Sequence, residues 1–218
     1  MSSKNEKQKK IYLTNKPNDE NSDILIIKLL IVGDSGVGKS NFIYRYTKDK
    51  FSSSNFSSSG FDSNSKEIEI SDKKIIVKLW DSAGQEKYKS ITKNLFTRVQ
   101  GIIIVYDITN KKSFLNVKNW INLIKETDNT IPYVLAGNKC DLENQRVVEE
   151  DDAIKFSNDN NIDFLETSAK QDINIMECIN NFVNKIVNSE NFNRNISFAL
   201  QNTSVRSNKT VNKSEKCC

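Results

Sequence analysis

Apolar runs alternate with amphipathic stretches through the central part of the chain. Six runs rich in Ile, Val and Leu have the length of strands, at residues 24–32, 66–70, 75–80, 101–107, 133–137 and, with its exit loop, 163–169. Five stretches carry apolar residues at helical spacing, at residues 41–50, 90–98, 112–126, 149–158 and 173–187. This alternation predicts an α/β fold with a six-stranded, mostly parallel sheet and five helices. The polar turn 71–74 joins two strands as a hairpin, which predicts one antiparallel edge strand.

The two ends of the chain and one internal stretch lack this patterning. Residues 1–23 are polar and aperiodic, which predicts a disordered arm before a single domain at residues 24–188. Residues 189–218 are rich in Asn, Ser and Lys and predict a flexible basic tail that ends in Cys217 and Cys218. Within the domain, eight of the fifteen residues 51–65 are serine, which predicts a mobile loop.

Charge and composition exclude several classes of function. The net charge of +4 lies mostly in residues 189–218, which hold five Lys or Arg and two Glu. The domain itself therefore lacks the positive charge expected of a nucleic-acid-binding surface. A basic tail suits an anionic membrane surface, and a solvated linker is the equal alternative. The chain contains no histidine, which excludes His general bases and His zinc ligands. Its four cysteines lack zinc spacing and no apolar leader precedes them, so we expect a reduced, cytosolic compartment.

Residues 33–40 read GDSGVGKS and fit the pattern G-x-x-x-x-G-K-[ST] between a predicted strand and a predicted helix. Such a loop turns backbone N–H groups inward around an anion, which glycine permits. Lys39 would reach the β- and γ-phosphates, and the Ser40 hydroxyl would ligate Mg²⁺. The alternative to a phosphate-binding loop is a glycine turn that only connects the strand to the helix. The residues predicted to bind the phosphates are Gly33, Asp34, Ser35, Gly36, Val37, Gly38, Lys39, Ser40 and Asn41.

A second motif, DSAGQE, begins at Asp81 where a predicted strand ends. A carboxylate at this place in P-loop proteins holds Mg²⁺ directly or through water. The N–H of Gly84 could meet a γ-phosphate without a Cβ in the way, and the amide of Gln85 could orient a water. Each residue alone is a weak signal, since Asp at a strand end is ordinarily a turn residue. The order of the two motifs along the chain is a stronger one.

A third motif, NKCD, leaves the predicted strand 133–137. Its carboxylate, Asp141, could accept both guanine N1–H and N2–H₂, whereas adenine offers neither donor there. Asn138 opens the motif, and the stem of Lys139 could lie over the plane of the base. An N–H of the segment Ser168, Ala169 and Lys170 could meet guanine O6. A polar loop is the alternative for NKCD taken alone.

Together, GDSGVGKS, WDSAGQE, NKCD and ETSAK occur in an order and at intervals that resemble the Ras superfamily of small GTPases. VYDIT, the leading Trp80 and the terminal Cys-Cys resemble its Rab branch. The resemblance covers about residues 24–188 and the last two residues. It implies the Ras-like P-loop NTPase fold.

The resemblance implies further roles at matching positions. Phe51 stands where the family packs an aromatic ring against guanine. Ser58 stands where it has a Mg²⁺-ligating Thr, which gives Ser40, Ser58 and Asp81 as metal ligands. Gln85 and Lys39 match its catalytic positions, and Cys217 and Cys218 match its doubly geranylgeranylated tail, which supplies the two lipids that stable anchoring requires.

The chain also departs from this family. Switch I usually carries Thr followed by I-G-V-D-F, and here Ser58 is followed by residues 59–63, SGFDS. The usual Y-Y-R-G near the end of switch II is LFTR at residues 95–98. Of the family's aromatic triad for partner recognition, the chain would offer Ser63, Trp80 and Leu95.

The resemblance implies a monomeric, Mg²⁺-dependent GTPase that cycles between GTP and GDP as a switch in vesicle traffic. It implies an exchange factor, a GTPase-activating protein, effectors that touch switch I (52–62) and switch II (82–90), and machinery for prenylation and membrane extraction. The expected location is the cytoplasmic face of an intracellular membrane, with a cytosolic pool. Two alternatives stay open: a nucleotide-binding scaffold that hardly cycles, suggested by the serine-rich switch I, and a P-loop ATPase, against which NKCD and TSAK speak.

Overall fold

The computed structural model of the protein describes residues 13–14, 24–52, 63–82, 94–190 and 192. Within these residues its strands are β1 (Leu13–Thr14), β2 (Ile24–Val32), β3 (Ser63–Ile70), β4 (Lys73–Asp81), β5 (Gly101–Asp107), β6 (Tyr133–Asn138) and β7 (Asp163–Thr167). Its helices are α1 (Lys39–Lys48), α3 (Lys111–Leu115), α4 (Val117–Thr127), the 3₁₀ helix η1 (Cys140–Gln145), α5 (Glu150–Asn160) and α6 (Ile175–Val187).

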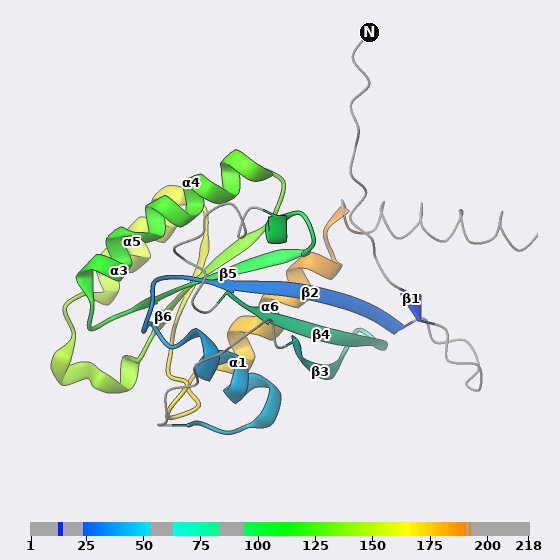
Figure 1. Ribbon diagram of the computed structural model, residues 1–218, viewed down its shortest axis with the longest axis horizontal. Coiled ribbons are helices and arrows are strands. Elements are labelled where there is room, and N and C mark those ends of the chain that lie inside the picture. The colour runs from blue at the N-terminus through cyan, green and yellow to red at the C-terminus, as the bar shows by residue number, and fades with distance from the viewer. Residues whose placement is uncertain (1–12, 15–23, 53–62, 83–93, 191, 193–218) are drawn as a thin grey trace, which may run out of the picture.

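The strands form one sheet in the order β3-β4-β2-β5-β6-β7 (Figure 1). All pairs from β4 to β7 are parallel, and β3 pairs antiparallel with β4 at the edge. The predicted α/β fold, with its six-stranded, mostly parallel sheet and antiparallel edge strand, is confirmed. The structure adds β1, a two-residue strand within the segment predicted as a polar arm, which pairs antiparallel with β2.

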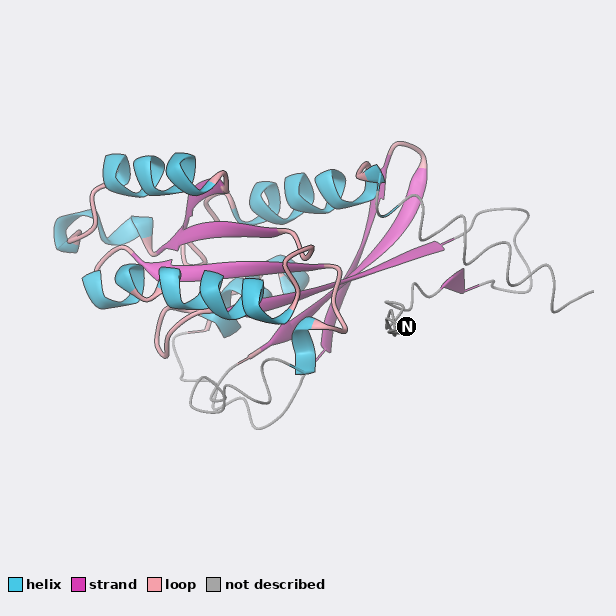
Figure 2. Ribbon diagram, turned by 90° about the horizontal axis from the view of Figure 1, so that it is seen from above, coloured by secondary structure: helices cyan, strands magenta, loops and turns pink. Residues whose placement is uncertain are grey.

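Apolar side chains of alternate strand residues fill two cores, one on each face of the sheet. Leu29 and Ile31 of β2 face the core formed with α1 and α6, whereas Leu30 and Val32 face the core formed with α3, α4 and α5. Such continuous apolar runs are typical of strands that helices cover on both faces. Figure 2 shows the resulting three layers, with the sheet between two sets of helices.

The hairpin of β3 and β4 turns more tightly than the predicted polar turn 71–74. Ile70 pairs with Lys73, which leaves Ser71 and Asp72 as a two-residue loop. Both have positive φ angles, 50° and 60°. These angles match the type I′ turn, whose twist fits the right-handed twist of the paired strands.

The predicted single helix at residues 112–126 is wrong, because two helices, α3 and α4, meet at Asn116. α3 begins after Asn110, whose side-chain oxygen accepts hydrogen bonds from the N–H groups of Lys112 and Ser113. The sequence also did not predict η1, so the predicted total of five helices does not hold. Of the predicted helix 90–98, residues 94–96 are helical and residues 90–93 lie outside the described residues.

The segment after α6 extends the core beyond the predicted end of the domain at residue 188. Phe192 is 5% exposed and packs in the same core as α6. No helix in the described part of the chain has the length and apolar character needed to cross a bilayer.

We predict that Phe182→Ala, in α6, lowers the free energy of unfolding by about 3–5 kcal/mol because it leaves a large cavity. Phe182 is buried, and a Cβ added at Gly101 would lie only 2.7 Å from its ring. The neighbouring Asn181 is exposed on the same helix, so Asn181→Ala is the matched control and should change stability by about 0.5 kcal/mol or less. Urea denaturation of both variants measures the difference. Equal stabilities would contradict the placement of α6 against the sheet.

Candidate functional site

The carboxyl ends of five parallel strands meet at one edge of the sheet. β2 leads into the glycine loop 33–40, β4 ends at Asp81, β5 at Asp107 and β6 at Asn138. The last strand, β7, leads into Ser168, whose N–H bonds to the carbonyl of Ile173. Because β4 and β5 flank β2 on opposite sides, this edge lies at the switch point where α/β sheets bind ligands.

The glycine loop takes backbone angles that L side chains rarely adopt. Gly33, Gly36 and Gly38 have φ angles of 145°, 81° and 98°. A Cβ at Gly33 would lie 2.1 Å from the carbonyl oxygen of Val105, and one at Gly38 would lie 2.4 Å from Nδ2 of Asn138. Gly33 and Gly38 are therefore required both by their angles and by the close approach of other parts of the chain.

Lys39 holds the loop in a closed curve. Its Nζ donates hydrogen bonds to the carbonyl oxygens of Gly33, at 2.8 Å, and Asp34, at 2.7 Å. The side chain is largely buried, so a cation lies within the loop at the N-terminus of α1. A helix N-terminus and an ammonium group both favour a bound anion.

Two of the three predicted metal ligands lie together. The Ser40 hydroxyl donates a hydrogen bond of 2.5 Å to Oδ2 of Asp81. Hard oxygen ligands of this kind suit Mg²⁺, which in nucleotide sites takes one or two protein oxygens and phosphate oxygens. The residues present therefore fit the predicted cation. Ser58, the third predicted ligand, lies outside the described residues.

Asn138 connects the glycine loop to the end of β7. Its Nδ2 donates to the carbonyl oxygen of Val37 at 2.8 Å. Its Oδ1 accepts from the N–H of Ala169 at 3.3 Å and from the hydroxyl of Thr167 at 3.4 Å. One buried amide thus joins two loops that are more than a hundred residues apart in the sequence.

Lys139 follows in the left-handed conformation, with a φ of 69°. This angle costs a non-glycine residue roughly 1–3 kcal/mol and occurs preferentially at functional sites. Its Nζ donates to the carbonyl oxygen of Gly36 at 2.8 Å and pairs with Oδ2 of Asp107 at 2.6 Å. The stem of Lys139 therefore runs alongside the glycine loop.

Asp141 is oriented by the segment after β7. The hydroxyl of Ser168 donates to its Oδ1 at 2.6 Å and accepts from the N–H of Gln171 at 2.9 Å. Arg45 of α1 donates to the carbonyl oxygens of Ala169 and Lys170, which fixes this segment against the first helix. The structure thus brings together the predicted groups at residues 138–141 and 168–170.

A charged pair fixes the end of the 3₁₀ helix η1, which contains Asp141. Arg146 makes two hydrogen bonds of 2.7 Å to the carboxylate of Glu166 in β7, and both side chains are largely buried. These bonds, with those to Glu143, raise the pKa of Arg146. Burial, followed by the charge of Glu166, raises the pKa of Cys140 and keeps its thiol protonated. Cys140 therefore packs as an apolar residue beside the site.

Sequence reasoning missed two side chains that hold the glycine loop. Asn116, between α3 and α4, donates to Oδ2 of Asp34 at 2.6 Å, and the indole N–H of Trp120 donates to Oδ1 at 3.3 Å. Asn116 makes this bond at the point where α3 and α4 meet. A signal existed in the sequence: the two residues are four positions apart, a spacing that places them on one helix face.

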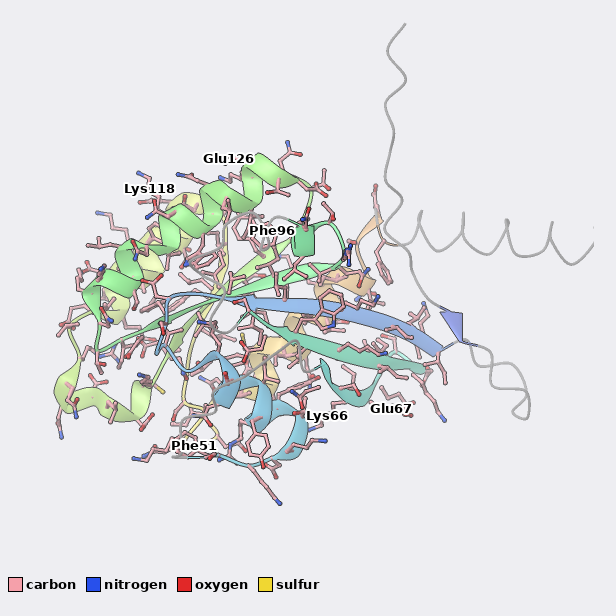
Figure 3. The ribbon with its side chains drawn as sticks, in the orientation of Figure 1. Phe51, Lys66, Glu67, Phe96, Lys118 and Glu126 are labelled. Atoms are coloured by element: carbon pink, nitrogen blue, oxygen red, sulfur yellow. The ribbon has the colours of Figure 1, made fainter. Side chains whose placement is uncertain are left out.

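The remaining predicted site residues either make no side-chain hydrogen bond to the glycine loop within the described part of the chain or lie outside it. Phe51 lies beyond the C-terminal end of α1 and is 38% exposed (Figure 3). Asn41, in α1, accepts a hydrogen bond from the N–H of Ser52 rather than turning to the loop. Gly84, Gln85, Cys217 and Cys218 lie outside the described residues.

These features define a P-loop protein: a glycine loop between a parallel strand and a helix, a lysine within it, and a Ser–Asp pair beside it.

Comparison with known proteins identifies the family. The model of the Ras family matches residues 28–188. The Ras-related protein Rab-13 of Canis lupus familiaris is 42% identical over 163 residues, which cover 74% of this chain and 80% of that protein. The human Ras-related protein Rab-8B is 41% identical over 154 residues, which cover 70% and 74%. The chain therefore belongs to the Ras family, as a Rab-type small GTPase.

We predict that Asn116→Ala loosens the glycine loop because Asp34 loses a charge-assisted hydrogen bond of about 1.5–3 kcal/mol. Amide hydrogen exchange over residues 33–38 should become roughly tenfold faster. Trp120→Phe, which removes the longer hydrogen bond and keeps an aromatic ring, should have a smaller effect. Lys118 points away from the sheet on the same helix (Figure 3), so Lys118→Ala is the control. Unchanged exchange in Asn116→Ala would contradict the role of this contact.

Proposed function

We propose that the protein binds GTP and GDP with Mg²⁺, hydrolyses the γ-phosphate of GTP, and acts as a membrane-anchored switch in vesicle traffic. The observation that carries this proposal is the bridge made by Asn138. It joins a phosphate-type loop to the pair of Asp141 and Ser168. The proposed phosphate-binding loop and the proposed base-reading residues are therefore in contact through one side chain at one edge of the sheet.

The phosphate end supplies positive charge and N–H groups. Lys39 is held in the loop by the two carbonyl oxygens, and this orients its ammonium group for the β- and γ-phosphates. Ser40 and Asp81 would hold Mg²⁺, which when bound neutralises charge that develops on the transferred phosphoryl group. Gln85 would orient the attacking water. We expect slow intrinsic turnover, because the sequence offers no evident arginine finger in cis. An activating protein would supply one.

The base end discriminates by hydrogen bonding. Ser168 holds one oxygen of Asp141 in place, which fixes the carboxylate plane for the N1–H and N2–H₂ donors of guanine. Adenine would leave the carboxylate unpaired, and such sites discriminate by ~10⁴-fold or more. The stem of Lys139, held between Gly36 and Asp107, would form one wall of the base site.

The membrane part of the proposal rests on Cys217 and Cys218. Two geranylgeranyl groups on these cysteines would anchor the chain stably, whereas a single lipid anchors only marginally. Regulators and effectors would bind at the switch stretches, and the anchored protein would exchange with a cytosolic pool.

We predict that Asp141→Asn lowers GTP affinity by roughly a hundredfold or more, because two hydrogen bonds to a charged acceptor are lost. Affinity for xanthosine triphosphate should rise, since the new amide can donate to a carbonyl at C2 of the base. Competition against a fluorescent GDP analogue measures both affinities. Asp159 lies exposed on α5, so Asp159→Asn makes the same chemical change away from the site and should leave both affinities unchanged. Normal GTP binding by Asp141→Asn would overturn the assignment of the base-reading loop.

A further inference from the structure

Three cationic side chains gather on the face of the sheet opposite the core of α1 and α6. Lys28 of β2 and Lys78 of β4 are direct partners in the parallel register, so their side chains leave the sheet on the same face. Val77 and Leu79, the neighbours of Lys78, are buried in the core on the opposite face. Arg98 follows the helical turn 94–96, and its charge acts on Lys28. We refer to Lys28, Lys78 and Arg98 as the cationic cluster.

The cationic cluster places like charges close together. Like charges directly opposite each other in a sheet are destabilising, by up to about 1 kcal/mol. Burial, followed by the charges of Lys78 and Arg98, lowers the pKa of Lys28. Within the described part of the chain, neither Lys78 nor Arg98 forms an ion pair. Lys78 and Arg98 are therefore the two cations of the cluster that an acidic partner could neutralise.

The cluster lies around the side chain of Trp80, and backbone hydrogen bonds fix the segments that carry its residues. Trp80 lies on the same face of β4 as Lys78, is half-buried, and has Nζ of Lys28 at 5.6 Å from its ring centroid. Gln100 pairs with the backbone of Lys28 in both directions, with hydrogen bonds of 2.8 Å, and so fixes the segment that carries Arg98. Leu95 is buried in the core formed with α3, α4 and α5, whereas Trp80 is half-buried and so partly accessible.

We propose that the cationic cluster and Trp80 dock an acidic segment of a partner protein, with carboxylates against Lys78 and Arg98 and an apolar side chain against Trp80. Tryptophan and arginine are enriched among residues that dominate binding energy at protein interfaces. An acidic partner would relieve the repulsion within the cluster. The proposal rests on the proposed function in one respect, because it names the chemistry of a partner for the surface between the two switch stretches.

A protein segment fits this surface better than an anionic membrane. Sequence-readable lipid recognition uses clusters of about four to eight basic residues, and this cluster has three. Glu67 of β3 is exposed on the same face. It pairs with Ile76, two residues before Lys78, and would repel a continuous anionic plane. A partner segment can place its carboxylates selectively at Lys78 and Arg98. The β3–β4 hairpin also extends beyond the helices (Figure 2).

The test uses the full-length protein loaded with a non-hydrolysable GTP analogue. The probes are a peptide of alternating Glu and Leu and its Gln-for-Glu counterpart, titrated while the indole N–H signal of Trp80 is followed by NMR. The acidic peptide should shift the signal and bind at least tenfold more tightly than the neutral one. Its affinity should fall between 50 and 200 mM NaCl, as screening requires. Equal binding of the two peptides, or no shift of Trp80, would overturn the proposal.

Two variants separate docking from structure. The double variant Lys78→Gln and Arg98→Gln should lose at least tenfold in affinity for the acidic peptide and keep or raise the melting temperature, because repulsion is removed. Lys118→Gln, which removes an exposed charge on α4, should leave peptide affinity unchanged. A falling melting temperature with unchanged peptide affinity would show a structural role and overturn the proposal.

Two further outcomes complete the test. Vesicles with 30% phosphatidylserine, bound through the same two cations in place of the peptide, would identify a membrane surface and also overturn the proposal. Affinity for the GTP analogue is measured separately in every variant and should not change. Wild-type protein that does not bind the GTP analogue would contradict the proposed function. The peptide results test only the docking surface.

Discussion

The side-chain amide of Asn138 is the interaction on which the site depends. It lies at the end of β6, donates to the glycine loop through Val37, and accepts from Ala169 beyond β7. Its approach is so close that no side chain fits at Gly38. The glycine at that position is therefore determined by a residue a hundred positions away, as much as by the curvature of the loop itself.

The remaining contacts of the site extend from this centre in both directions. Lys139 connects the glycine loop to β5, Ser168 orients Asp141, and Arg146 fixes the end of the helix η1 that contains Asp141. On the other side of the loop, Asn116 and Trp120 hold Asp34. Each contact joins the carboxyl end of a strand to a neighbouring loop, so the parallel sheet determines which loops meet. An ordered loop of this kind reduces the free energy needed to arrange donors around an anion on binding.

The strands could be predicted from the sequence because the central ones are runs of β-branched and apolar residues, such as Gly101–Asp107 and Ile24–Val32 with its single Lys28, and the hairpin strands alternate apolar with polar residues. The glycine loop and the position of the NKCD loop at the end of β6 could be predicted because each motif lies in a few consecutive residues beside a strand. The division of the helix at Asn116 could not be predicted, since residues 112–126 have an unbroken helical period, and neither could the bond from Asn116 to Asp34, which is far away in the sequence. The pairing of β1 and the like-charged partnership of Lys28 with Lys78 are likewise properties of register, which local patterns do not contain.

The central claim is that this edge of the sheet binds guanine nucleotide and turns it over. Single-turnover hydrolysis of GTP by the full-length protein, with Mg²⁺ and then with EDTA, tests it most directly when compared with the variant Gln85→Leu. We predict slow hydrolysis by the wild-type protein that requires Mg²⁺ and falls about tenfold or more in Gln85→Leu, a loss of roughly 1.4 kcal/mol of transition-state stabilisation. GTP affinity should be the same in both. Wild-type protein that binds GTP but hydrolyses it no faster than Gln85→Leu, even with activating proteins present, would contradict the claim and identify a nucleotide-binding scaffold.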